Sequence, residues 1–373
     1  MSPPIDVSEL PVAAQRALTP DAPAPLRQMA AKGILPGAKP EHLVTLLAAL
    51  SQDADPILAA TARTTLSQLP DNVRDGALQG NLQPVVIEAL VELFGDRPAV
   101  VEQLLRMPRI GENAIVRLAE RATEHIGELV ATNETLLLTF PRAIEALYMN
   151  KRVRMSTADR VLELAVRNQL ELGIPAYKEA AQAIANELIA EPSIEPTPDD
   201  LLFQHIDRVA EATALSDDED THAIDDEGKE LLREKFLPLF ASISQMTITQ
   251  KIRRGILGTS AERMLLIRDN NRLVASAAAS SPLLNESEAA RIASNRNVID
   301  DVLRIIAQNR TFTRNYQVKL NLVLNPRTPL SFSSRMVTHL RDNDLRSISK
   351  SRNVPANIQA LARQQLSRKQ GGG

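Results

Sequence analysis

The chain contains no cysteine and no tryptophan among its 373 residues. Without cysteine it forms no disulfide, no thiolate zinc site, no iron–sulfur cluster and no cysteine nucleophile. Aromatic residues make up only 3% of the chain, too few for the base-stacking surfaces of many RNA-binding proteins. The core must therefore be built from Leu, Ile, Val and Ala, which favours close-packed helices over sandwiches and barrels.

Glycine is also scarce, with 14 residues, and none lies in a phosphate-binding or dinucleotide-binding loop. No Gly-x-Ser-x-Gly nucleophile motif is present. The Arg253-Arg254-Gly255 stretch indicates either a phosphate contact or the end of a helix, and we favour the helix end. The five histidines show no zinc-binding spacing. We therefore expect a protein that is not an enzyme and that has no cofactor and no metal site.

Long hydrophobic stretches are missing as well. The first residues show no basic region followed by an apolar stretch, as a secretory signal would require. No run of about 18 apolar residues could cross a bilayer. We therefore expect a cytoplasmic location and no transmembrane segment.

Four prolines are evenly spaced, and they provide the first positive signal. Pro56, Pro70, Pro84 and Pro98 follow one another at intervals of fourteen residues through leucine-rich sequence. Proline is tolerated in the first turn of a helix and excluded from its interior. The spacing therefore predicts short helices at a fixed step, as in an α-solenoid.

The sequence divides into four regions. Residues 1–40 are rich in proline and alanine and are expected to form a loosely attached arm. Residues 41–190 carry apolar stripes at three- and four-residue spacing, which predicts an N-terminal array of helical repeats. The acidic residues 191–230 and the basic residues 231–370 complete the chain.

Residues 191–230 carry a strong negative charge. The segment contains fourteen Asp or Glu and only two basic residues, and it begins with several prolines. Such composition predicts a mostly extended linker, with one amphipathic helix around Phe203 and Ile206. A calcium-binding loop beginning at Asp217 is not expected, because His222 and Gly228 occupy positions that require glycine and a bidentate glutamate.

Asn-containing turns punctuate the C-terminal region. Apolar stretches end at Asn295, Asn309 and Asn325, and asparagine commonly marks a helix end. The first two are again fourteen residues apart, so residues 231–370 are predicted to form a second helical array. No segment alternates as a strand does, so we expect an all-α protein without a sheet.

The stretch Val318-Lys-Leu-Asn-Leu-Val-Leu-Asn-Pro-Arg-Thr-Pro329, together with the other Asn-ended helices, resembles bacterial HEAT-like and leucine-rich-repeat-variant solenoids. Residues 246–370 also resemble the C-terminal part of an uncharacterised bacterial helical-repeat family. The resemblance implies an α-solenoid of short helical hairpins in two arrays, and it implies no activity.

The C-terminal region is strongly basic. Residues 246–373 contain 21 Lys or Arg and 8 Asp or Glu, although the whole chain has a net charge of −3. If equivalent repeat positions lie on one edge, the basic residues near helix ends form a ridge for an acidic partner. The candidate ridge consists of Arg296, Arg310, Arg314, Lys319, Arg327 and Arg341.

The ridge leaves several interpretations open. It could bind an acidic protein segment, a nucleic acid or anionic lipid heads, or the acidic segment 191–230 could fold back onto it. It could also be a solvated surface whose cations favour helix C-termini. The net negative charge and the scarcity of aromatics favour a scaffold or adaptor for protein partners. A nucleic-acid-associated protein is the alternative, and an enzyme or its regulatory subunit is a second alternative.

Overall fold

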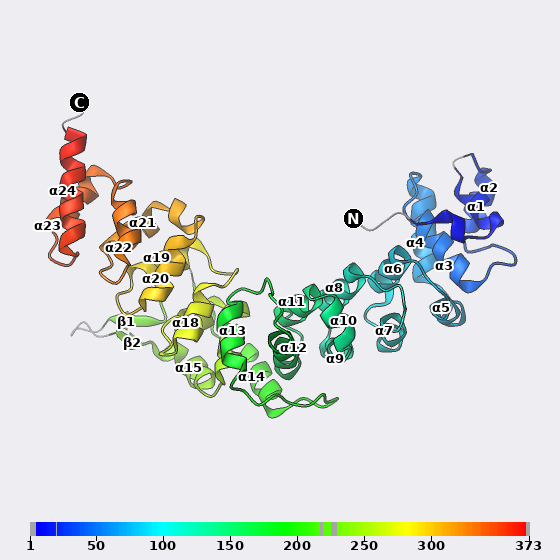
Figure 1. Ribbon diagram of the computed structural model, residues 1–373, viewed down its shortest axis with the longest axis horizontal. Helices are drawn as coiled ribbons and strands as arrows, with labels where there is room; N and C mark the ends of the chain where they lie inside the picture. Colours follow the sequence, from blue (N-terminus) through cyan, green and yellow to red (C-terminus); the bar gives the residue numbers. More distant parts are fainter. Residues whose placement is uncertain (1–4, 20, 217–218, 225–229, 371–373) are drawn as a thin grey trace. The chain divides into compact units, whose positions relative to one another are not determined.

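A computed structural model of the protein describes residues 5–19, 21–216, 219–224 and 230–370. These residues form 24 α-helices, three short 3₁₀ helices and two short strands (Figure 1). The protein is therefore all-α, as predicted. The expectation that no sheet forms is wrong, because two three-residue strands pair at the C-terminal end of the acidic segment. No described helix is long and apolar enough to cross a membrane.

The chain folds into two compact units, and the first comprises Met1–Leu172 together with Glu191–Glu195. Its helices in chain order are η1 Val7–Glu9, α1 Val12–Leu18, α2 Ala24–Ala31, α3 Pro40–Leu50, α4 Pro56–Ser67, α5 Asp71–Leu78, α6 Pro84–Phe94, α7 Pro98–Leu105, α8 Glu112–Arg121, α9 Glu124–Ala131, α10 Glu134–Thr139, α11 Arg142–Met149 and α12 Met155–Arg167.

The second unit comprises Gly173–Ala190 and Pro196–Gly373. Its elements in chain order are α13 Tyr177–Ile184, α14 Pro198–Ala212, β1 His222–Ile224, β2 Glu230–Leu232, η2 Glu234–Phe236, α15 Leu237–Ser244, α16 Ile248–Leu257, α17 Ser260–Leu266, α18 Arg272–Ala279, α19 Glu286–Ser294, α20 Asp300–Gln308, η3 Phe312–Arg314, α21 Tyr316–Leu324, α22 Leu330–Val337, α23 Asp342–Lys350 and α24 Ala356–Gln370.

The evenly spaced prolines begin helices, as the sequence predicts. Pro56, Pro84 and Pro98 are the first residues of α4, α6 and α7, and Pro70 directly precedes α5. A first-turn proline is favoured because its missing N–H would have no partner inside the helix. The fourteen-residue step therefore corresponds to one short helix and the turn that follows it.

The N-terminal region packs closely on unit 1, so the expectation of a loosely attached arm is wrong for its described residues. Ala14 and Ala17 of α1 and Ala30 of α2 are fully buried. The side chain of Gln83 also accepts a hydrogen bond from the Asp6 N–H and donates one to the Asp6 carbonyl, at 2.7 and 2.8 Å. Small alanine side chains permit this close helix packing, and the composition alone gave no sign of it.

The helices pack in two interleaved series. Successive members of each series lie two or three places apart in the chain. In unit 1, α6 packs on α8, α8 on α11, α7 on α9 and α9 on α12. In unit 2, α16 packs on α18, α18 on α20, α17 on α19 and α19 on α21. Because isolated helices of 7–13 residues are marginal in water, these contacts supply most of their stability.

Asparagine side chains at helix C-termini join successive helices of the same series. The amide of Asn150, after α11, donates to the carbonyls of Ala119 and Ala122 at the end of α8, both at 2.9 Å. Asn325, after α21, donates to the carbonyls of Ala293 and Asn295 at the end of α19, at 2.9 and 2.8 Å. Both asparagines are buried. Each satisfies carbonyls that the neighbouring helix leaves without an intrahelical partner.

We expect the Asn325→Ala substitution to destabilise unit 2 by about 1–3 kcal/mol, because it leaves buried carbonyls without donors. Asn309→Ala is the matched control. Asn309 also ends a helix, but within the described residues its side-chain oxygen accepts only a local hydrogen bond, from the Thr311 N–H at 2.9 Å. Hydrogen exchange in α19 and α21 measures the difference, and equal protection in the two variants would contradict the structural role of Asn325.

The acidic segment is more ordered than expected. The amphipathic helix expected around Phe203 and Ile206 is present: residues 198–212 form α14, the longest helix of this region. Thr197 and Asp200 form a capping box at its start, and Phe203 and Ile206 are buried. Its apolar face therefore belongs to the core of unit 2. Part of the segment, residues 217–218 and 225–229, lies outside the described residues.

Unit 2 also includes α13, which precedes the acidic segment. The sequence analysis placed residues 177–184 in the N-terminal array, whereas α13 packs on α16 and α18. Its buried side chains are Ala180, Ala183 and Ile184. The apolar periodicity of this helix identified its buried face, but periodicity does not indicate which neighbour covers that face.

Candidate functional site

Five of the six residues of the predicted ridge lie at two opposite ends of the helices in unit 2, and the sixth, Lys319, lies inside α21. Consecutive helices joined by short turns run antiparallel, so a fourteen-residue step reverses the direction of the chain. Positions one step apart therefore lie at opposite ends of the hairpins, and positions two steps apart lie at the same end. The prediction that Arg296, Arg310 and Arg327 share one edge is wrong for this reason.

Arg296 and Arg327 lie on the first edge, which we call edge A. They follow α19 and α21 respectively, and the bonds from Asn325 to the end of α19 hold the two turns together. Arg327 also donates to the Val298 carbonyl at 3.2 Å. Both arginines are exposed, and neither forms an ion pair with any described carboxylate.

Arg310, Arg314 and Arg341 lie at the opposite ends of the helices, after α20, η3 and α22. The Arg341 N–H donates to the Tyr316 hydroxyl at 3.0 Å, and its guanidinium stacks on the Tyr316 ring. This contact brings the turn after α22 to the start of α21. Lys319 lies on neither edge: it is on α21 and lines a groove between α20 and α22.

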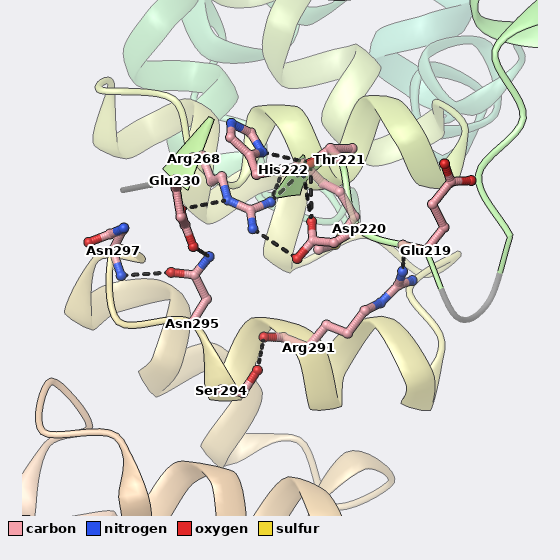
Figure 2. A network of polar contacts seen from close by, with 11 residues as sticks. Glu219, Asp220, Thr221, His222, Glu230, Arg268, Arg291, Ser294, Asn295 and Asn297 are labelled. Carbon is pink, nitrogen blue, oxygen red and sulfur yellow. Dashed lines mark hydrogen bonds and ion pairs between the residues drawn. The ribbon is translucent and has the colours of Figure 1, made fainter. Parts of the chain in front are cut away.

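An acidic hairpin occupies part of edge A. Strands β1 and β2 pair antiparallel, with His222 opposite Leu232 and Ile224 opposite Glu230. A two-stranded hairpin is marginal by itself, so it requires support from its surroundings. Figure 2 shows this support: side chains from the turn after α17 and from α19 point toward the hairpin.

Arg268 is the central residue of this network. Its side chain is 11% exposed and donates to Asp220 Oδ2 and to the Thr221 hydroxyl, both at 3.1 Å. Its Nε also lies 3.8 Å from Glu230 Oε2. One guanidinium thus contacts carboxylates on both sides of the hairpin, because five N–H donors project from a planar group.

Two residues of α19 complete the network (Figure 2). Arg291 donates to the Glu219 carbonyl, and the Asn295 amide donates to Glu230 Oε1 at 3.0 Å. Asn295 ends α19 as Asn325 ends α21. The amide of Asn295 donates to Glu230 of the hairpin, whereas the amide of Asn325 donates to carbonyls at the end of α19. The hairpin therefore takes the place of a repeat neighbour for Asn295.

None of the three residues that hold the hairpin, Arg268, Arg291 and Asn295, belongs to the predicted ridge. A signal for Arg268 was present, since it precedes the Asp269-Asn270-Asn271 turn as a basic residue at a helix end. Arg291 lies inside α19, and nothing in the sequence distinguishes it from a solvated helical arginine. The fold-back of the acidic segment was one of the interpretations left open, and these contacts join that segment to the C-terminal helices.

Two side chains of the hairpin, Asp220 and His222, have pKa values below their usual ones. Burial raises the pKa of Asp220, but the charge and hydrogen bond of Arg268 outweigh burial, so the pKa falls below its usual 3.8. Burial is the main cause that lowers the pKa of His222 from 6.5, and the charge of Arg268 lowers it further. Glu230 and Asp220 oppose this shift only partly. The docked hairpin therefore favours an ionised Asp220 and a neutral His222.

We expect docking of the hairpin to weaken as the pH falls from 7.5 to 5.5. A group whose pKa is lowered in the docked state contributes stability above its free pKa and loses it on acidification. The free pKa of His222 is about 6.5, so this residue titrates first. Hydrogen exchange of residues 219–224 and 230–233, corrected for intrinsic rates, should increase.

The His222→Gln variant is the control for this prediction and should remove most of the pH dependence in the same range. An unchanged exchange rate between pH 7.5 and 5.5 in the parent protein, or the same pH dependence in the variant, would refute the role of His222.

A second group of charges in unit 2 is buried and structural. Arg254 on α16 contacts Asp207 and the Phe203 carbonyl on α14, and its Nη1 lies 3.5 Å from Glu262 Oε1. Arg263 on α17 pairs with Glu288 on α19 at 2.8 Å. Burial raises the pKa of Glu262, although the charge of Arg254 opposes this shift. These pairs connect α14, α16, α17 and α19.

Gly255 does not end a helix, so the preferred interpretation of the Arg253-Arg254-Gly255 stretch is wrong at this residue; α16 ends two residues later, at Leu257, with Gly258 as its C-cap. Gly255 lies inside α16, and a Cβ there would meet Ala278 Cα of α18 at 3.0 Å. Arg253 and Arg254 are buried. The glycine allows α16 and α18 to approach closely, and the arginines are part of the core.

We expect Glu288→Ala to destabilise unit 2 by about 3 kcal/mol, because it leaves the buried Arg263 without its carboxylate. The double variant Arg263→Met/Glu288→Leu should recover most of this loss. Asp301→Ala, which removes the shared partner of the exposed Arg272 and Arg304, should cost less than about 1 kcal/mol. Denaturant titration measures all three, and equal losses for Glu288→Ala and Asp301→Ala would contradict the assignment.

The described residues contain no group of three or more His, Asp or Glu placed to hold a metal ion. Asp217 and Gly228, which were considered for a calcium loop, lie outside the described residues. Comparisons with family models, with curated proteins and with solved structures found no match. The resemblance to bacterial helical-repeat solenoids therefore stays a prediction.

Proposed function

We propose that the protein is a non-enzymatic scaffold or adaptor that presents helical-repeat surfaces to protein partners. In this proposal each unit is a short α-solenoid, since helices two places apart pack together and equivalent asparagines join them. Unit 2 binds an acidic segment of its partner along edge A.

The docked hairpin is the observation that carries this proposal. Arg268, Arg291 and Asn295 hold an acidic segment through its carboxylates and through one backbone carbonyl. Carboxylate recognition by arginine depends on geometry and charge more than on sequence. The same chemistry is therefore suited to another acidic chain.

Edge A continues beyond the hairpin with Arg296 and Arg327. Both are exposed, and neither is paired with a described carboxylate. Unpaired cations in a row attract acidic segments and lose much of that attraction as salt screens them. We therefore place the partner contact at these two arginines, next to the acidic hairpin.

The test uses the full chain and a fluorescein-labelled twelve-residue polyglutamate, measured by fluorescence anisotropy. We expect Arg296→Ala/Arg327→Ala to weaken binding about tenfold or more, which corresponds to about 1.4 kcal/mol. Arg346→Ala/Arg368→Ala removes the same charge from exposed positions elsewhere in unit 2 and should change affinity less than about twofold.

Two further arms separate the competing interpretations. Asp220→Asn/Glu230→Gln loosens the hairpin and should strengthen polyglutamate binding, because a tethered competitor is removed. A twelve-residue oligothymidine tests the nucleic-acid alternative. If the oligonucleotide binds more tightly than polyglutamate at equal salt, or if both double arginine variants bind alike, the proposed acidic-protein contact at edge A fails.

A further inference from the structure

A groove lies between α20 and α22 in unit 2, away from edge A. Its walls come from the end of α20, from η3, from α21 and from α22, and its volume is about 620 Å³. These helices are the neighbouring orange elements of Figure 1. The volume is within the range of about 300–1,000 Å³ that is typical of ligand sites in proteins.

The polar lining of this groove contains no acidic residue. Lys319 from α21, Arg335 from α22 and His339 after α22 face it, together with the uncharged Gln308 and Thr313. Neither Lys319 nor Arg335 forms an ion pair with a carboxylate in the described part of the chain. The groove therefore carries positive charge without an internal counter-charge.

Two other grooves of comparable size in the described part of the chain are different, because acidic side chains lie among their lining residues. The groove formed by α13, α18 and α20 contains Arg304, which pairs with Asp301 at 3.2 Å. The groove formed by α3, α6, α8 and α11 contains Arg117, whose Nε lies 3.5 Å from Glu92. A charged lining that is basic throughout thus distinguishes the α20–α22 groove from these two grooves.

Arg335 is held in a definite orientation. Its Nε donates to the Ser331 carbonyl at 2.9 Å, and its guanidinium stacks on the Phe332 ring at 5.3 Å from the centroid. These contacts use Nε and one face of the guanidinium. The two terminal nitrogens have no hydrogen-bond partner among the described residues, and such a pair matches the two oxygens of a carboxylate.

Apolar side chains lie between these polar groups. Ala307, Phe332 and Met336 line the same groove, and Met336 is 8% exposed. Methionine is flexible and polarisable, so it adapts to apolar groups of different shapes. The combination suits a ligand that carries both an apolar side chain and neighbouring carboxylates.

We infer that the α20–α22 groove binds an acidic peptide segment of a partner protein by one apolar anchor residue flanked by carboxylates. The anchor lies against Phe332 and Met336, and the carboxylates contact Arg335 and Lys319. The inference rests on the proposed adaptor function. It uses none of the edge A residues, so the two sites are tested separately.

The groove is less suited to a nucleic acid. Single-stranded nucleic acids bind through aromatic rings on which successive bases stack. In the described structure this groove offers only Phe332 and His339 as rings, and Arg335 covers one face of Phe332. An aliphatic anchor, in contrast, requires only apolar contact.

The experiment follows the methyl resonance of Met336 in the full chain labelled with [¹³C]methyl-methionine. The probe is the peptide (Glu-Glu-Leu)₄, with (Glu-Glu-Ser)₄ and (Gln-Gln-Leu)₄ as matched controls. Met336→Leu assigns the resonance, and the remaining methionine signals report whether each variant is folded. We expect (Glu-Glu-Leu)₄ to shift the Met336 signal and each control peptide to bind at least tenfold more weakly at this site.

The variant Lys319→Ala/Arg335→Ala should weaken the binding measured at Met336 at least tenfold, whereas Arg296→Ala/Arg327→Ala and the control Arg346→Ala/Arg368→Ala should leave it within about twofold. If the Met336 signal does not move at a peptide concentration that saturates the anisotropy change, the peptide binds elsewhere and the groove inference is wrong.

Three other results would also contradict the groove inference. The first is that Lys319→Ala/Arg335→Ala retains the Met336 shift. The others are that (Glu-Glu-Ser)₄ binds in the groove as tightly as (Glu-Glu-Leu)₄, or that oligothymidine moves the Met336 signal at a lower concentration than the peptide does.

Loss of edge A binding in the anisotropy assay, with the Met336 shift intact, contradicts the edge A contact and leaves the groove in place. The opposite pattern contradicts the groove alone. The two failures are therefore distinguishable.

Discussion

Short helices cannot stand alone, and this constraint organises the whole molecule. Most of the helices have fewer than twelve residues, so each depends on its neighbours to bury its apolar face. Packing between helices two places apart supplies that burial. Asn150 and Asn325 add polar connections by satisfying the terminal carbonyls of the preceding helix. The same type of bond in both units indicates that one local solution is used repeatedly along the chain.

The ends of such helices form surfaces whose charge is not determined by the core. In unit 1 many basic residues face acidic ones on the adjacent helix, as Arg121 does with Glu92. In unit 2, Arg268 is neutralised by the acidic hairpin, whereas Arg296, Arg327 and Arg335 remain without described acidic partners. A partner therefore gains most from electrostatic contact at these three arginines.

The acidic segment shows how composition alone is insufficient. Its high density of like charge predicted a mostly extended linker with one amphipathic helix, and that helix, α14, packs into unit 2 because Phe203 and Ile206 reach the core and Arg254 neutralises Asp207. Likewise Arg268 makes the small hairpin stable by contacting Asp220 and Glu230 together. The acidic side chains of the segment repel one another, and basic side chains from α16 and from the turn after α17 offset this repulsion by pairing with them.

The sequence by itself determined the all-α class and many of the helix boundaries. Proline at a helix start and asparagine at a helix end act on their own backbone, so Pro84 and Asn325 mark helix boundaries wherever the helices pack. Only the tertiary structure decided which side chains meet. Arg310 is separated from Arg296 because the chain reverses at each turn, and Lys319 joins Arg335 because α21 and α22 pack together. Such proximity depends on the path of the chain between residues, which no local pattern encodes.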